Sequence, residues 1–122
     1  MPGGQKQVQA QQLLSLMREA LRVCTALRKF SEEKFAAFEG EDDEKIIAAI
    51  KDRELIINSL INLEYRIDLL LDGADGYGKA LPREVDELRR EIRSVLSQVS
   101  AIDIRAMRVV SGKMQKYRDE TL

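Results

Sequence analysis

A glycine-rich segment in the second half of the chain has almost the spacing of a phosphate-binding loop. Residues 73–80 satisfy the pattern GxxxxGK up to the position after the lysine. A phosphate-binding loop needs Ser or Thr at that position to hold Mg²⁺, and a strand before its first glycine. Here Ala80 takes the position, a predicted helix comes first, and Asp72 and Asp75 would repel a triphosphate. These acids do not fit the spacing of a calcium loop either, so we predict an interhelical loop over 72–81.

Six arginines near the end of the chain offer the best basis for an enzyme, because inward-facing guanidinium groups can clamp a dicarboxylate. The segment 88–92 also resembles the opening of the first helix in small helical chorismate mutases, but in that fold the long helix begins the chain and here it ends it. Glutamates interleave with the arginines, which favours intrahelical ion pairs on a solvated face. The residues concerned are Arg83, Arg89, Arg90, Arg93, Arg105 and Arg108, with Glu84, Glu87 and Glu91.

The chain has no histidine and a single cysteine, which leaves few candidates for catalysis. A cysteine nucleophile usually needs a neighbouring histidine, and metal or acid–base sites need clustered His, Cys or carboxylates. Cys24 lies in an apolar stripe, so we predict a buried and reduced packing residue. We therefore expect no enzymatic activity, no cofactor and no metal site.

Three long helices are predicted to carry these segments. The first spans about residues 5–39 and ends at Gly40, just before three acids that favour a new helix start. The second spans about 43–71 and the third about 82–117. At 1.5 Å per residue each helix is about 45–50 Å long. We predict an all-α fold, an elongated antiparallel bundle of three amphipathic helices with coiled-coil character, as a single domain over 1–122.

The third predicted helix has the most regular apolar pattern in the chain. A heptad alternates by three and four without interruption over Val85, Leu88, Ile92, Val95, Val99, Ile102, Ala106 and Val109. A second apolar stripe then begins, formed by Met107, Val110, Met114 and Tyr117. This stripe has two interpretations: it packs against the first helix, or it forms part of an adaptable groove, because Met and Tyr suit surfaces that accept more than one helix geometry.

The second predicted helix carries more apolar surface than one packing face needs. Between Leu55 and Leu71 the apolar side chains wrap well beyond the roughly 100° stripe of a surface helix. Three helices of this length make a thin core, so the surplus on the second and third helices needs further cover. We predict that a partner helix or a second copy of the chain supplies it.

Composition restricts the partner and the location. Hydrophobic residues make up 44% of the chain and charged residues 34%, which fits a folded helical domain. The net charge of −1 lacks the basic footprint of a nucleic-acid-binding protein. No apolar run is long enough for a membrane span, and the first residues lack a secretory signal. We expect a cytoplasmic protein with no membrane insertion and no nucleic-acid partner.

The order of these features resembles the FlgN/FliT type of bacterial flagellar export chaperone. The resemblance rests on a long first helix, the acidic break at 40–43, and the segment 51–64, in which a charged pair precedes Leu-Ile and then Leu at helical spacing. A long amphipathic final helix follows, and the resemblance covers about residues 10–117. It implies a type III secretion chaperone that binds the amphipathic C-terminal helical region of a hook–filament junction or cap protein and prevents premature assembly before export.

On this resemblance, a groove between the second and third helices would hold the partner helix, and the export apparatus would be a further partner. The residues expected at that surface are Leu60, Ile61, Leu63, Met107, Val110, Met114 and Tyr117. The alternative is a homo-oligomeric helical scaffold or adaptor, in which the same apolar surplus pairs with a second copy. A homodimer is the simplest such assembly.

Overall fold

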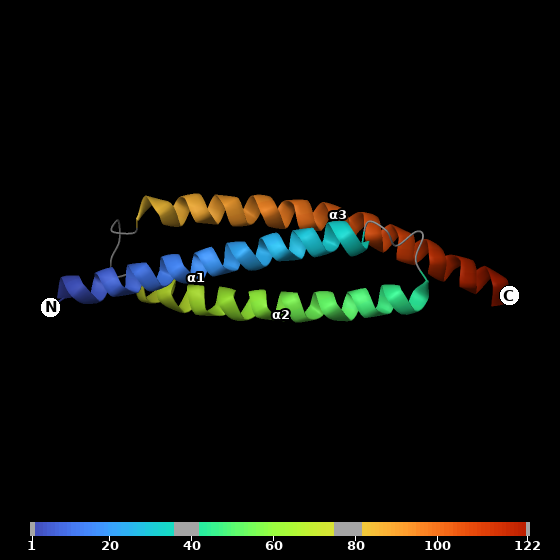
Figure 1. Cartoon of the computed structure of the whole chain (residues 1–122), viewed down its shortest axis with the longest axis horizontal. Coiled ribbons are helices and arrows are strands. Elements are labelled where there is room, and N and C mark those ends of the chain that lie inside the picture. Colours follow the sequence, from blue (N-terminus) through green and yellow to red (C-terminus); the bar gives the residue numbers. More distant parts are fainter. Residues whose placement is uncertain (1, 36–41, 75–81, 122) are drawn as a thin grey trace.

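The computed structural model describes residues 2–35, 42–74 and 82–121 (Figure 1). Helix α1 spans Pro2–Phe30 and continues as a short π-helix, η1, over Ser31–Phe35. Helix α2 spans Asp43–Ala74, and helix α3 spans Arg83–Thr121. No strand occurs in the described residues, so the prediction of an all-α protein with three helices is confirmed.

The helix ends differ from their predicted positions. Helix α1 begins at Pro2, before the predicted start at residue 5, since proline lacks the N–H that a first turn leaves unsatisfied. Helix α2 continues to Ala74, so the start of the predicted glycine-rich loop is helical, and the remainder, 75–81, lies outside the described residues. Helix α3 continues to Thr121, past the predicted end at 117. The predicted end of the first helix, at residue 39, also lies outside the described residues.

Asp42 caps the start of α2. Its Oδ1 accepts a hydrogen bond from the backbone N–H of Lys45 at 2.9 Å, and its carbonyl oxygen accepts one from the N–H of Ile46 at 3.1 Å. Asp43 and Glu44 follow in the first turn, where negative charge is favoured by the helix dipole. The acidic residues that interrupted the sequence pattern therefore begin the second helix.

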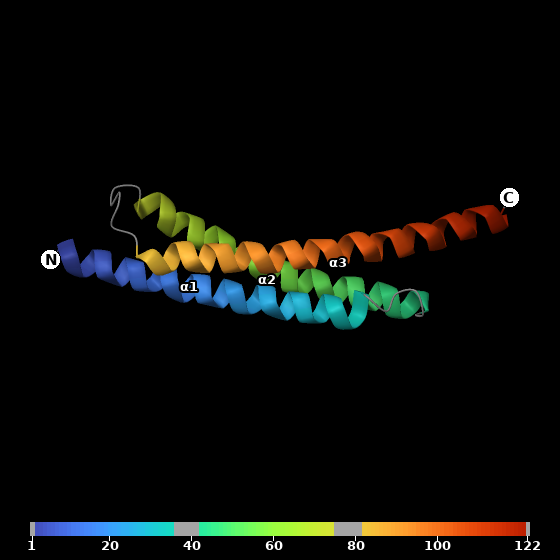
Figure 2. The same cartoon turned by 90° about the horizontal axis from the view of Figure 1, so that it is seen from above.

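Helix α1 lies between the other two helices (Figure 1). It packs against both α2 and α3, whereas α2 and α3 contact each other much less. Figure 1 shows that α2 runs in the opposite direction to α1 and α3, and Figures 1 and 2 show that the C-terminal end of α3 projects beyond the described parts of its neighbours. The bundle therefore leaves one side of α2 and one side of α3 without cover from α1.

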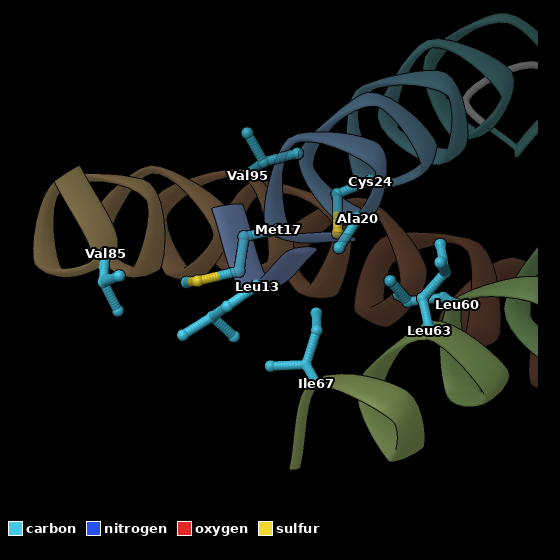
Figure 3. Close-up of a cluster of buried hydrophobic side chains, with 9 residues drawn as sticks. All are labelled: Leu13, Met17, Ala20, Cys24, Leu60, Leu63, Ile67, Val85 and Val95. Carbon is cyan, nitrogen blue, oxygen red and sulfur yellow. The ribbon is translucent and has the colours of Figure 1, made fainter. Parts of the chain in front are cut away.

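The main core lies where all three helices meet (Figure 3). Cys24 is fully buried there, as the sequence predicted for a packing residue. The heptad of α3 is also confirmed, because all eight of its positions are buried or half-buried. The nine buried residues of this core are Leu13, Met17, Ala20 and Cys24 of α1, Leu60, Leu63 and Ile67 of α2, and Val85 and Val95 of α3.

A second, smaller core lies toward the end of the bundle where α1 finishes. It consists of Phe35, Ile46, Ala49, Ile102 and Ala106, with Phe30, Val109 and Val110 packed around it. The π-helix η1 has about one more residue per turn than an α-helix, and both Ser31 and Phe35 in it are buried. Phe30 and Phe35 then meet edge to face, with 6.0 Å between their ring centroids.

Candidate partner-binding groove

A groove runs between α2 and α3, and α1 forms its floor. Its cavity volume is about 290 Å³. Met17 and Ala20 of the floor are almost completely buried, whereas Leu71, Ile92 and Leu96 on the walls are only half-buried. A partner seated in the groove would therefore gain most from these wall residues. The groove is lined by Met17, Ala20, Leu60, Glu64, Ile67, Asp68, Leu71, Arg89, Ile92, Arg93 and Leu96.

The two rims of the groove carry opposite charges. Glu64 and Asp68 lie one turn apart on α2, and Arg89 and Arg93 lie one turn apart on α3. All are exposed except Arg89, which is half-buried. Across the described residues, no ion pair or side-chain hydrogen bond joins one rim to the other. An acidic rim therefore faces a basic rim over an apolar floor.

The polar bridges between α2 and α3 lie at the other end of the bundle. Arg53 of α2 pairs with Asp103 of α3. Lys113 Nζ lies 3.9 Å from Asp43 Oδ1, and the hydroxyl of Tyr117 donates a hydrogen bond to the same carboxylate. The groove lies toward the opposite end, where no such bridge occurs among the described residues.

The Arg53–Asp103 pair lies between the two apolar cores and is itself mostly buried. The side chains are 25% and 22% exposed, and the Arg53 guanidinium also lies over the Phe35 ring, 5.6 Å from its centroid. Arg53 Nε, Asp103 Oδ1 and the hydroxyl of the fully buried Ser31 have no hydrogen-bond partner among the described residues. This is the most polar position in the interior.

Large apolar side chains remain exposed on α2 and α3. On α2, Ile61, Tyr65 and Leu69 recur every fourth residue, on the face turned away from the core. On α3, Met107 and Met114 are both 61% exposed. No large apolar side chain described in α1 is exposed to this degree. The surplus predicted for the second and third helices is therefore present.

The seven residues that the sequence placed at a partner surface do not lie on one surface. Leu60 and Leu63 are buried in the main core, and Leu60 also lines the groove. Ile61 is 56% exposed and does not line the groove. On α3, Val110 is half-buried against the second core. The other three are exposed: Met107, Met114 and Tyr117.

The exposed methionines nevertheless share a face of α3 with the basic rim. Positions 89, 93, 96, 100, 103, 107, 110 and 114 recur by three and four, which places them along one side of the helix. A shallow depression lies on this side, lined by Ser100, Asp103, Ile104, Met107, Arg108 and Ser111. The surface predicted near residue 107 is therefore in line with the groove, beyond the Arg53–Asp103 bridge.

Sequence reasoning missed the groove walls themselves. Leu71 and Ile92 were predicted only as members of apolar patterns, and no role was predicted for Leu96, Glu64 or Asp68. Their position next to the heptad could have identified the residues of α3, because Arg89, Arg93 and Leu96 each directly follow a heptad position and so lie along one side of the heptad. Such flanking positions contact whatever packs next to the helix.

Among the described residues, Cys24 and Tyr117 have titratable groups with clearly shifted pKa values. Burial raises the pKa of the Cys24 thiol to about 11, and the negative charge of Glu64 adds to the shift. The hydrogen bond from Tyr117 to Asp43, followed by the negative charge of that carboxylate, raises the pKa of the Tyr117 hydroxyl. Cys24 therefore stays a neutral thiol at physiological pH, which suits packing rather than nucleophilic chemistry.

Neither a membrane span nor a metal cluster is found in the described ranges. No helix there combines the length and the apolar content needed to cross a bilayer. No three His, Cys, Asp or Glu side chains in these ranges are grouped so as to hold a metal ion. No family model matches the chain, and neither a curated protein nor a solved structure similar to it is found.

Proposed function

We propose that this protein is a chaperone that holds an amphipathic helix of another protein in the groove between α2 and α3. The observation that carries the proposal is the groove itself, which has an apolar floor and half-buried apolar walls, and over which no helix of the described residues lies. A helix laid there would bury Leu71, Ile92 and Leu96 against its own apolar stripe. We propose further that the three helices act as an elongated antiparallel bundle with coiled-coil packing.

The arrangement of the helices supports a helical occupant. In a four-helix bundle each helix packs against two neighbours and lies diagonally opposite the third. Helix α1 packs against both α2 and α3, and these two contact each other little. The three helices therefore occupy three corners of such a bundle, and a partner helix in the groove would take the fourth.

The proposed physiological partner is a secreted flagellar protein. The layout of the sequence supports this, since a long first helix, an acidic break and a long amphipathic last helix are the features shared with FlgN/FliT-type export chaperones. A secreted helix kept in the groove could not assemble early, because its apolar stripe would be covered. The proposal places the protein in the cytoplasm, with the C-terminal helical region of a hook–filament junction or cap protein as cargo and the export apparatus as receiver.

Calorimetric titration with these cargo segments tests the proposal. Wild-type protein should bind a C-terminal helical segment, and Leu71→Ala with Leu96→Ala should weaken binding by about a hundredfold, because each truncation removes about 1–1.5 kcal/mol of apolar contact. The matched control is Leu55→Ala with Leu69→Ala, since these leucines are 69% and 54% exposed on the other side of α2. The control should bind like wild type.

The two parts of the proposal fail in different ways. If the cargo segments do not bind but another amphipathic helix does, with the expected loss in the Leu71/Leu96 variant, the flagellar assignment is wrong and the holding of helices stands. If the Leu71/Leu96 variant keeps its helical circular dichroism and binds as tightly as the Leu55/Leu69 control, the groove is not the binding surface.

A homo-oligomeric scaffold is the second candidate function. It is favoured by the outward stripe of α2, in which Ile61, Tyr65 and Leu69 are 56%, 64% and 54% exposed and do not line the groove. Two copies could cover these stripes by packing them together. Sedimentation equilibrium at micromolar concentration tests the scaffold against the chaperone. A stable monomer excludes the scaffold, whereas a dimer that dissociates in an Ile61→Asp, Leu69→Asp variant supports it.

A further inference from the structure

We infer that the groove selects its helix by charge, and that it accepts a partner helix with basic residues along the edge next to α2 and acidic residues along the edge next to α3. This inference rests on the proposed function. It concerns which helix is held and in which direction, beyond the apolar contact that any amphipathic helix would make.

The rims are matched in register across the groove. Because α2 and α3 run in opposite directions (Figure 1), residues that are later in α2 face residues that are earlier in α3. Starting from the Arg53–Asp103 bridge, this order places Glu64 opposite Arg93 and Asp68 opposite Arg89. Two acids on one side thus face two bases on the other, one turn apart in each case.

These four charges have no partners of their own within the described part of the chain. None of them takes part in an ion pair or side-chain hydrogen bond there, although other arginines and lysines on the three helices do, among them Arg18, Arg28 and Arg83. The rims are held apart by the width of the groove, with α1 below them. A helix in between would bring counter-charges to both rims and leave none of the four unpaired.

The charge pattern also sets the direction of the bound helix. Turning a helix end for end while its apolar stripe stays on the floor exchanges the edges that face α2 and α3. A helix with one basic and one acidic edge therefore has one favoured direction. A helix with two basic edges meets like charges on the α3 side in either direction, and one with two acidic edges meets them on the α2 side.

Three synthetic peptides test the inference. Each is about 18 residues long, long enough to exceed the groove wall from Leu60 to Leu71, and each has the same leucine stripe. The first has one edge of lysines and one of glutamates, the second has lysines on both edges, and the third has glutamates on both. Fluorescence anisotropy at low salt should show the mixed peptide binding about five- to tenfold more tightly than either uniform peptide, with the preference lost at about 1 M NaCl.

Charge reversal on one rim at a time should change the preferred peptide. Glu64→Lys with Asp68→Lys makes both rims basic, so the peptide with two acidic edges should become the tightest binder. Arg89→Glu with Arg93→Glu makes both rims acidic and should favour the peptide with two basic edges. The matched controls are Glu54→Lys on α2 and Arg105→Glu on α3, which are exposed residues outside the groove and should keep the wild-type order.

The outcomes separate this inference from the proposed function. If the three peptides bind equally well to the wild type and to both rim variants, selection by charge is wrong, while the holding of helices stands. If none of the peptides binds, both are overturned. If the mixed peptide binds only by splitting a dimer of the protein, the groove is occupied by a second copy, and the inference of a charged partner helix is overturned.

Discussion

Replacing the Arg53–Asp103 pair tests the account of the interior. The two side chains are only 25% and 22% exposed, so removal of one partner leaves the other charged group largely buried and without its counter-charge. For a fully buried pair this costs about 3–5 kcal/mol, and the remaining exposure reduces the expected cost to about 2 kcal/mol. We expect this loss for Arg53→Met and for Asp103→Leu.

The double variant should recover most of the lost stability. Arg53→Met with Asp103→Leu places apolar groups between two apolar cores, next to Phe35, and removes both buried charges. Its free energy of unfolding should lie within about 1 kcal/mol of the wild type, which makes the coupling between the two sites about 3 kcal/mol. Urea unfolding followed by circular dichroism measures the free energy of unfolding of each variant. The midpoint of the transition should be about 1.5 M lower than that of the wild type for each single variant.

The control for this cycle is the exposed pair between Arg18 and Glu84. Its atoms approach to 2.7 Å, but the side chains are 59% and 58% exposed. Water and salt screen such a pair, so the same cycle there should give less than about 0.5 kcal/mol of coupling. Equal coupling in the two cycles, or strictly additive losses at Arg53 and Asp103, would refute the reasoning that burial makes the interior pair different.

Two further predictions concern single positions. A Cβ added at Gly112 of α3 meets no atom within 4 Å, so Gly112→Ala should raise the free energy of unfolding by up to about 1 kcal/mol, seen as a higher melting temperature, and a lower one would show that the open space is absent. Because the pKa of Cys24 is raised from 9.0 to about 11, its neutral form is favoured by folding; stability from this group is present below pH 9 and is lost as the pH rises toward 11. Thiol labelling of native protein at pH 8 should therefore be slow and should accelerate on unfolding, and equally fast labelling of both states would contradict the burial.

The sequence predicted the helices better than their arrangement. The heptad of α3 and the acidic residues Asp42 and Asp43 at the start of α2 are local signals. The cap of α2 and the burial of the heptad positions follow from them directly. The sequence could not predict which apolar residues of α2 are buried and which are exposed. Leu60 and Ile61, for example, are adjacent apolar residues that differ only in their angular position around the helix axis, yet the first is buried and the second is exposed. That rotation is fixed by α1, which lies far away in sequence.

The π-helix η1 shows a second limit of sequence reasoning. An uninterrupted α-helix was predicted through Ser31 to Phe38, and no residue type in that stretch marks a change of helical period. The segment makes tertiary contacts, since Phe35 packs in the second core and against Arg53. A change of period that depends on packing between distant segments cannot be predicted from local spacing.

The buried ion pair connects the interior to the candidate groove. Apolar residues occur on both sides of Arg53 along α2, so apolar packing alone would tolerate a shift of α2 by a turn or more relative to α3. A charged group that finds its counter-charge in only one register removes that freedom, as single polar core positions do in coiled coils. Glu64 and Arg93 lie about equally far from the pair along their helices, so the same register sets the acidic rim opposite the basic one. A variant with an apolar pair at 53 and 103 should then keep its stability and lose its preference among helices of different edge charge.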